Sequence, residues 1–160
     1  MKTFTDSAGH TWTLSITIDA IKRVQGLLPG VVLADLMAGD PPLLTRLESD
    51  IVLLCDVIYA LIKPQADTAG VTDVDFGAAL GGEAITAAHD AFWSELADFF
   101  RKLGRADQAK AIDKQSALVK AAVSAVDQRI DTIDVDAAIS QALSSSATNS
   151  PASSASTPGP

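Results

Sequence analysis

The sequence predicts a mainly α-helical fold in which an N-terminal β-hairpin precedes a helical bundle and a disordered C-terminal tail. Three features of the sequence indicate this class. Within residues 2–18, apolar and polar residues alternate strictly from Thr11 to Ile18, which is the pattern of a strand with one buried face. From residue 19 to residue 143, apolar residues recur at the spacing of amphipathic helices. Residues 144–160 contain no charge and no large apolar side chain, so they cannot bury enough surface to fold.

The length and composition predict one domain with its own core over residues 1–143. A chain of 160 residues with 48% hydrophobic residues has enough apolar surface for a single core. The net charge of −8 disfavours binding to nucleic acid or to an acidic membrane surface, because both need clustered Lys and Arg. The apolar run at residues 51–62 is shorter than the roughly 20 residues of a membrane-spanning helix. With no recognisable signal peptide, the sequence predicts a cytoplasmic protein that binds neither nucleic acid nor membrane.

The hairpin is predicted for residues 2–18, with a turn at residues 6–9. The turn contains Asp, Ser and Gly, and Gly9 is able to adopt a positive φ. Phe4 is expected on the apolar face of the first strand. On the second strand the apolar positions alternate with Thr and Ser: Trp12, Leu14, Ile16 and Ile18. A lone hairpin is marginal in water, so its apolar face must rest on helices or pair with the sheet of another chain.

The helical core is predicted for residues 19–103. A short helix covers residues 19–28, and residues 31–42 are expected to form a short helix or a turn. Residues 72–82 begin with a Thr three residues before an Asp, which is a weaker form of the capping box, and end at a Gly pair. This segment therefore predicts another short helix.

A longer helix is predicted for residues 42–63, with Pro64 as its stop. Residues 51–62 of this helix are apolar except for Asp56, so they are apolar nearly all round. We therefore expect the helix to be buried on several sides. Cys55 lies within this run, and its expected role is that of a small buried hydrophobic residue.

The last core helix is predicted for residues 83–103, and it holds half of the aromatic residues of the chain. Its acidic residues lie early and its basic residues late, which matches the helix dipole. The wide apolar face is more typical of core packing than of membrane binding. Because large aromatic residues are also enriched at interface hot spots, a partner-binding surface is the alternative. That surface would consist of Phe92, Trp93, Leu96, Phe99 and Phe100.

Residues 105–143 are predicted to form one or two long helices after the core. Apolar residues in this segment recur at separations of 7, 4, 3, 4 and 3 residues, with Ser116 at the skipped position. This heptad pattern is typical of a coiled coil, so the segment predicts an oligomer seam. The seam consists of Ile112, Val119, Val123, Val126, Ile130 and Ile133.

The sequence shows no pattern of catalytic or metal-ligating residues. His10 falls in the predicted hairpin, and His89 has Trp93, not a metal ligand, four residues later. Cys55 is the sole cysteine, so a disulfide within the chain is excluded. Nucleotide-binding, nucleophile-elbow and C-x-x-C motifs are absent from the sequence. We therefore expect a protein that is not an enzyme and that holds no metal or cofactor.

Three stretches carry a resemblance to a known family: "KTFTDSAGHTWTLSITIDAIKRV", "LLCDVIYALIKPQADTAGVTDVDFGAALGGEAI" and "ELADFF". They resemble the tail assembly chaperones of long-tailed bacteriophages and prophages. In that family a short hairpin is followed by helices and by a "D-F-G-x-A-L/M-x-G-x-A-I" stretch, which here is residues 75–85. The resemblance covers residues 2–103, whereas residues 105–143 do not match the family residue by residue. Three roles stay open for residues 105–143: an elaboration peculiar to this chain, the oligomer seam, or a second contact with the tape measure protein.

The resemblance implies a non-catalytic assembly factor that acts in the cytoplasm of the host cell. Such proteins coat the tape measure protein, keep it soluble, and help tail tube proteins polymerise around it. They are absent from the finished tail, and many are also made in a longer form by a ribosomal frameshift. The resemblance therefore names the tape measure and tail tube proteins as the expected partners.

Two other classes of function are consistent with the sequence. One is a structural component of the virion, such as a tail completion or connector subunit, which would be found in purified particles. The other is a bacterial helical adaptor protein outside any phage context. A slippery run in the gene near codons 140–160 would favour the chaperone over both alternatives.

Overall fold

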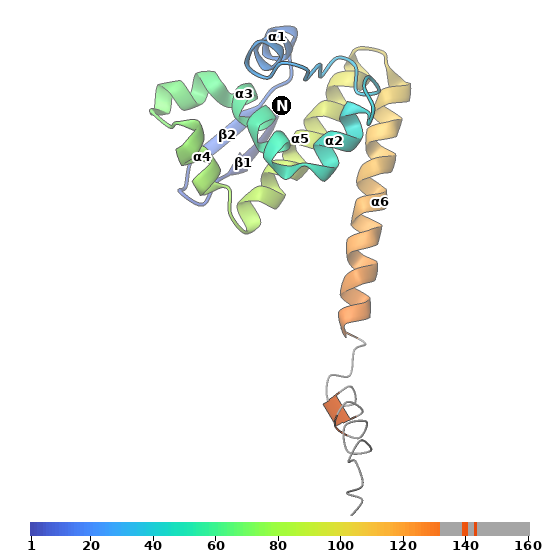
Figure 1. Ribbon diagram of the computed structural model, residues 1–160. Coiled ribbons are helices and arrows are strands. Elements are labelled where there is room, and N and C mark those ends of the chain that lie inside the picture. The colour runs from blue at the N-terminus through green and yellow to red at the C-terminus, as the bar shows by residue number, and fades with distance from the viewer. Residues whose placement is uncertain (132–138, 141–142, 144–160) are drawn as a thin grey trace, which may run out of the picture. The chain divides into compact units, whose positions relative to one another are not determined.

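The predicted fold class is confirmed: the computed structural model is mainly helical, with an N-terminal β-hairpin (Figure 1). The structure describes residues 1–131, 139–140 and 143. The disordered tail predicted for residues 144–160 lies outside the described residues. The chain divides into a compact unit, Met1–Ala117, and a second unit that begins at Leu118.

The hairpin forms within the chain. Strands β1 (Lys2–Thr5) and β2 (Thr11–Leu14) pair in antiparallel register, with Phe4 opposite Trp12. Both aromatic residues are buried, as the alternating pattern predicts. Gly9 in the turn has a φ of 89°, a backbone angle that L-residues rarely adopt.

The predicted second strand was too long. It does not reach Ile18, because Thr17 begins helix α1 (Ile18–Leu27) as its N-cap. The Thr17 hydroxyl accepts a hydrogen bond from the backbone N–H of Ala20 at 3.2 Å. Ile18 is consequently the first residue of a helix and is exposed to solvent, not buried on the face of a strand.

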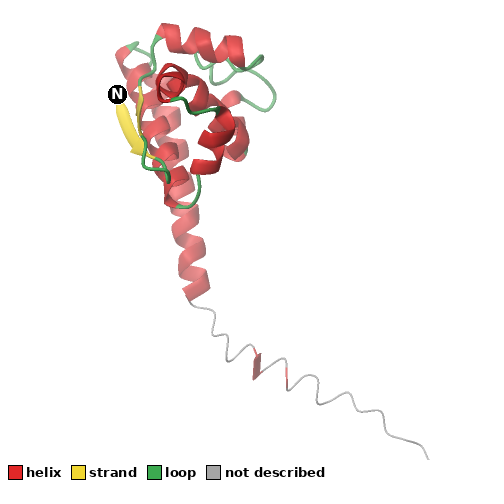
Figure 2. Ribbon diagram, turned by 90° about the vertical axis from the view of Figure 1, so that its left-hand side faces the viewer, coloured by secondary structure: helices red, strands yellow, loops and turns green. Residues whose placement is uncertain are grey.

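The buried face of the hairpin rests on two helices, as its marginal stability requires. Strand β1 packs on α5 (Glu83–Lys102) and β2 packs on α3 (Ile51–Ala69), and Figure 2 shows the yellow strands beside the red helices. The free edge of β2 is bonded to a side chain. The Gln65 amide accepts from the Thr13 N–H at 3.0 Å and donates to the Thr13 carbonyl at 2.7 Å. A side chain of α3 thus takes the place of a third strand.

The segment predicted as one helix over residues 42–63 is two helices. Residues 31–42 form turns, and α2 (Leu43–Ser49) and α3 follow with Asp50 between them. The backbone N–H of Asp50 closes the last turn of α2. Its carboxylate accepts hydrogen bonds from the N–H groups of Val52 and Leu53, at 3.1 and 3.0 Å, and so caps the start of α3. One residue therefore ends one helix and begins the next.

Pro64 does not stop α3, which continues to Ala69. A proline inside a helix lacks the N–H that would bond to the carbonyl four residues earlier, here that of Ala60. Arg23 of α1 bonds to that carbonyl instead: its guanidinium donates to the oxygens of Ala60 at 3.3 Å and Leu61 at 3.0 Å. A tertiary contact thus compensates for the local defect, which sequence periodicity does not reveal.

Replacing Arg23 with Met should lower the free energy of unfolding by about 1–2 kcal/mol, because a buried carbonyl loses its charged donor. In a Pro64→Ala background, an alanine N–H restores the helical bond to Ala60. In that background the same Arg23 replacement should lower the free energy of unfolding by about 1 kcal/mol less than it does in the wild type. Urea unfolding of the four proteins of this double-mutant cycle measures the difference. Equal costs in the two backgrounds would show that Arg23 does not compensate for Pro64.

Helices α4 (Asp73–Ala79) and α5 follow the sequence prediction closely. The Thr72 hydroxyl accepts from the Asp75 N–H at 3.2 Å, and the Asp75 carboxylate accepts from the Thr72 N–H at 3.1 Å. These bonds form the predicted capping box. Phe76 of α4 then packs into the core, its ring centroid 6.0 Å from that of Trp12 and 5.6 Å from that of Tyr59.

Helix α6 (Ala106–Asp131) forms most of the described part of the segment predicted for residues 105–143. Its last buried residue is Ile112, and the first compact unit ends at Ala117. The division of the chain therefore falls earlier than the domain end predicted at residue 143.

Candidate functional site

The aromatic face of α5 lies in the core of the first unit. Phe92, Leu96 and Phe100 are completely buried, Trp93 is 4% exposed, and only Phe99 is partly accessible. The interpretation of this face as core packing is confirmed. Four of the five residues considered as a partner-binding surface are thus covered by this chain itself, so the accessible surface for a partner must be sought elsewhere.

The residues of the predicted oligomer seam differ in their exposure. Ile112 is buried within the first unit and Val119 is partly buried. Three further members are exposed in this chain: Val123, Val126 and Ile130. Ile133 lies outside the described residues. The seam stays a prediction, and sedimentation analysis over a range of concentrations tests it: self-association is expected, and Val126→Asp should abolish it because a charge in an apolar seam destabilises the coil.

The apolar run of α3 is buried on several sides, as predicted, but one side is open to solvent. Ile51 is 50% exposed and Val52 is 66% exposed, and Asp56 lies on the same open side. Cys55, expected to be buried, is only partly so. The physical reason is that the elements packed on α3 cover its other faces. Apolar side chains therefore remain at the surface without a partner in this chain.

The open side of α3 borders a depression that we call the α3–α4 groove. Its central cavity has a volume of about 290 Å³. Two further cavities, of about 260 Å³ and 540 Å³, share Tyr59 and Asp73 with it, so the three are neighbours, and we include all three in the α3–α4 groove. The groove reaches Lys63 in α3 and Leu27 at the end of α1. Its central lining residues are Ile51, Val52, Cys55, Asp56, Tyr59 and Asp73.

The groove carries negative charge that this chain does not neutralise. Among the described residues, neither Asp56 nor Asp73 has a hydrogen-bond or ion-pair partner, whereas Lys63 is paired with Asp67. Partial burial, together with the nearby charges of Asp73 and Asp50, raises the pKa of Asp56 above its usual value. The groove thus combines an apolar surface with a carboxylate, that of Asp56, which has no cation beside it among the described residues.

The thiol of Cys55 lies in the same groove and is not activated. Burial and the neighbouring Asp56 carboxylate raise its pKa, so the thiol stays protonated near neutral pH. A protonated thiol is a poor nucleophile. Cys55 therefore contributes a weakly polar surface to the groove and, as the sole cysteine of the chain, provides a reporter for its occupancy.

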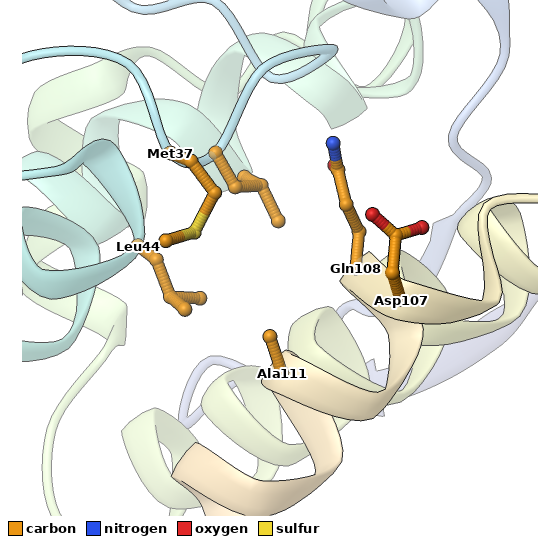
Figure 3. Close-up of a pocket in the computed structure, with 6 residues that line it drawn as sticks. Met37, Leu44, Asp107, Gln108 and Ala111 are labelled. Carbon is orange, nitrogen blue, oxygen red and sulfur yellow. The ribbon is translucent and has the colours of Figure 1, made fainter.

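A smaller cavity of about 200 Å³ lies between the start of α6 and the segment around α2. Figure 3 shows Met37 and Leu44 on one side of it and Asp107, Gln108 and Ala111 of α6 on the other. Gln108 is 8% exposed, and its buried Oε1 has no hydrogen-bond partner. The cavity has room for one small apolar group with a hydrogen-bond donor.

The two histidines take part in structural hydrogen bonds. His10 donates its backbone N–H to the buried Asp6 carboxylate at 2.9 Å, and its ring lies 3.2 Å from the same carboxylate. His89 accepts from the Trp93 indole N–H at 2.8 Å. Within the described part of the chain, no group of three or more His, Cys, Asp or Glu residues is placed to hold a metal ion. No helix in that part combines the length and the apolar character needed to span a membrane.

Comparisons with protein-family models, with curated proteins and with solved structures find no match to this chain.

Sequence reasoning missed the α3–α4 groove, although one residue signalled it. Asp56 is the single charged residue in the run 51–62. A charged residue in an otherwise apolar helix marks the side that faces solvent, since burying an unpaired charge is costly. Residues one turn before Asp56 lie on the same side, which would have placed Val52 at the surface.

Proposed function

We propose that this protein is a non-catalytic tail assembly chaperone of a long-tailed phage or prophage. It binds the tape measure protein in the host cytoplasm, keeps it soluble, and promotes assembly of the tail tube around it. The observation that supports this function best is the α3–α4 groove, which presents Ile51 and Val52 at the surface of a small helical unit, beside the partly buried Tyr59. A chaperone for a long helical protein needs such an apolar surface.

Two features of the chain support the same proposal. The resemblance to the family covers residues 2–103, which contain the whole groove. The net charge of −8 would keep a complex soluble while apolar surface is being covered and uncovered. Neither feature requires a reaction centre.

The proposal is tested by expressing the tagged protein together with the genes beside its own and identifying what co-purifies. A very long, helix-rich protein is the expected partner. In parallel, mass spectrometry of purified phage particles should detect the tube and tape measure proteins but not this chain. Finding this chain in the particles in stoichiometric amounts would instead make it a structural component, and recovery of the chain alone would overturn the chaperone function.

A further inference from the structure

We propose that the α3–α4 groove binds a helix of another protein in which an apolar stripe is flanked by Lys or Arg. The proposal rests on the proposed function, because it names the chemistry by which a helical partner is recognised. Three properties of the groove carry it: its length, its unpaired carboxylates, and the charge of the chain that contains it.

The length of the groove fits a helix better than a small molecule. Ile51, Cys55 and Tyr59 lie four residues apart along α3 and therefore on one side of it. The lining continues to Lys63, about 18 Å from Ile51 at 1.5 Å per residue. This distance corresponds to roughly three turns of a partner helix, whose apolar residues at i, i+4 and i+7 would meet this row.

The carboxylates specify the flanking charge of the partner. Asp56 and Asp73 belong to both the central cavity and the one that leads to α1, so they lie where a partner would be closest. Asp56 has no cationic partner among the described residues. The one lysine that lines the groove, Lys63, is paired with Asp67 and also interacts with the charge of Asp73. Burial raises the pKa of Asp56, and repulsion from the nearby charges of Asp73 and Asp50 raises it further. A Lys or Arg beside the apolar stripe of the partner removes this repulsion.

A second copy of this chain does not meet that requirement. Its net charge is −8, so a second copy supplies no overall excess of the positive charge that the groove needs. The exposed apolar residues of α6 lie in the segment 118–131, where one Lys and one Arg are balanced by two Asp residues. That helix face brings no excess of positive charge to the groove. The occupant is therefore a different protein.

The test uses a defined probe and the thiol of Cys55. The probe is a synthetic amphipathic helix about 18 residues long, with Leu and Ala on one face and Lys on both flanks. Its matched control carries Glu in place of Lys. The rate at which Cys55 reacts with a neutral aromatic disulfide is measured at about pH 8.5, near the ordinary thiol pKa. The Lys peptide should slow the reaction about tenfold at ten times its dissociation constant, and the Glu peptide should leave it unchanged.

Three variants separate charge from apolar contact. Asp56→Asn and Val52→Gln should each weaken binding of the Lys peptide about threefold to tenfold. The first variant removes the charge that attracts Lys, and the second removes an apolar contact. Asp107→Asn removes the same charge outside the groove and should leave the affinity unchanged. Asp56→Asn should also leave the melting temperature unchanged or raise it. The sign follows from the raised pKa of Asp56: the fold disfavours its charged form, so a neutral side chain is tolerated better.

The same variants, co-expressed with the tape measure protein, distinguish failure of this inference from failure of the proposed function. If the wild type and the Asp56→Asn and Val52→Gln variants retain the tape measure protein equally, the groove is not its binding site and the chaperone function stands. If the wild type does not retain the tape measure protein but the Lys peptide protects Cys55, the chaperone function is wrong and the groove is still a binding site for a basic helix. Equal protection by the Lys and Glu peptides, or by neither, overturns the groove as a site for a basic helix.

Discussion

Replacing Trp93 with alanine is expected to lower the free energy of unfolding by about 3–5 kcal/mol. Trp93 is 4% exposed, and its ring packs edge-on against Phe92 with centroids 5.2 Å apart. Its indole N–H also donates to His89, which would lose that bond. Removing the ring leaves a cavity in the core beside the middle of α5, and the surrounding side chains relax only partly to fill it. Urea unfolding followed by circular dichroism measures the change.

Phe99→Ala provides the matched control, because Phe99 lies on the same helix but is only partly buried. Its replacement should cost less than that of Trp93, since fewer contacts and less cavity volume are involved. If Trp93→Ala unfolds at the same urea concentration as the wild type, the aromatic face of α5 is not core. A loss of partner binding without a loss of stability would then restore that face as a docking surface.

Replacing Asp6 with alanine is expected to lower the free energy of unfolding by about 2–4 kcal/mol. The Asp6 carboxylate is buried in the hairpin and accepts from the Trp12 indole N–H at 2.8 Å and from the His10 backbone N–H at 2.9 Å. Alanine leaves both donors unsatisfied, and that of Trp12 is buried. Asp6→Asn retains one acceptor oxygen and should cost less. Thermal and urea unfolding of both variants measure the difference.

The stabilisation by Asp6 should also depend on pH. Burial raises the pKa of Asp6, but the hydrogen bonds from Trp12 and His10 outweigh it, so the pKa in the fold lies below its usual value. The unfolded chain therefore binds the proton more tightly. The stabilisation is complete above the ordinary value of about 3.9 and is lost as the pH falls through the lower value in the fold. The difference in unfolding free energy between the wild type and Asp6→Asn should shrink from about pH 7 to about pH 3. A difference that stays constant over this range would contradict the assigned hydrogen bonds.

The α3–α4 groove accounts for a feature that core packing leaves unexplained. A chain with a net charge of −8 can keep exposed apolar residues soluble, but the Asp56 carboxylate near Val52 has no cation or hydrogen-bond donor beside it among the described residues that would stabilise the fold. Asp56 in particular is disfavoured in its charged form. Binding of a partner explains why a residue that lowers the stability of the free protein is present, because its charge then pairs with a cation of the partner.

Features encoded by neighbouring residues were predictable from the sequence. The alternation around Trp12 predicted the hairpin, and the Thr72–Asp75 pair predicted the start of α4. The width of the apolar face predicted the burial of Phe92 and its neighbours in α5. Each of these patterns involves residues that are close in the sequence. The local structure that it predicts therefore depends little on the rest of the fold.

The interruptions of the helices were not predictable in the same way. The apolar pattern predicts that Asp50 lies inside one helix and that Pro64 ends it, whereas Asp50 separates two helices and Pro64 lies within the second. The effect of Pro64 depends on Arg23, which is distant in the sequence and adjacent only in the folded unit. A local rule for proline describes the missing N–H correctly, but it does not include a side chain that replaces the lost bond.

The sequence by itself determined the fold class, most of the helices and the residues of the core, because periodicity and caps act locally. Only the tertiary structure decided which side of α3 stays open. The sequence of a helix that is apolar nearly all round does not specify which of its faces is buried. The elements that pack on the helix determine which faces are covered and which one stays exposed. Val52 and Leu54 are both apolar and two residues apart, yet one is at the surface and the other is buried. The candidate binding groove exists because the elements packed on α3 leave that one side uncovered.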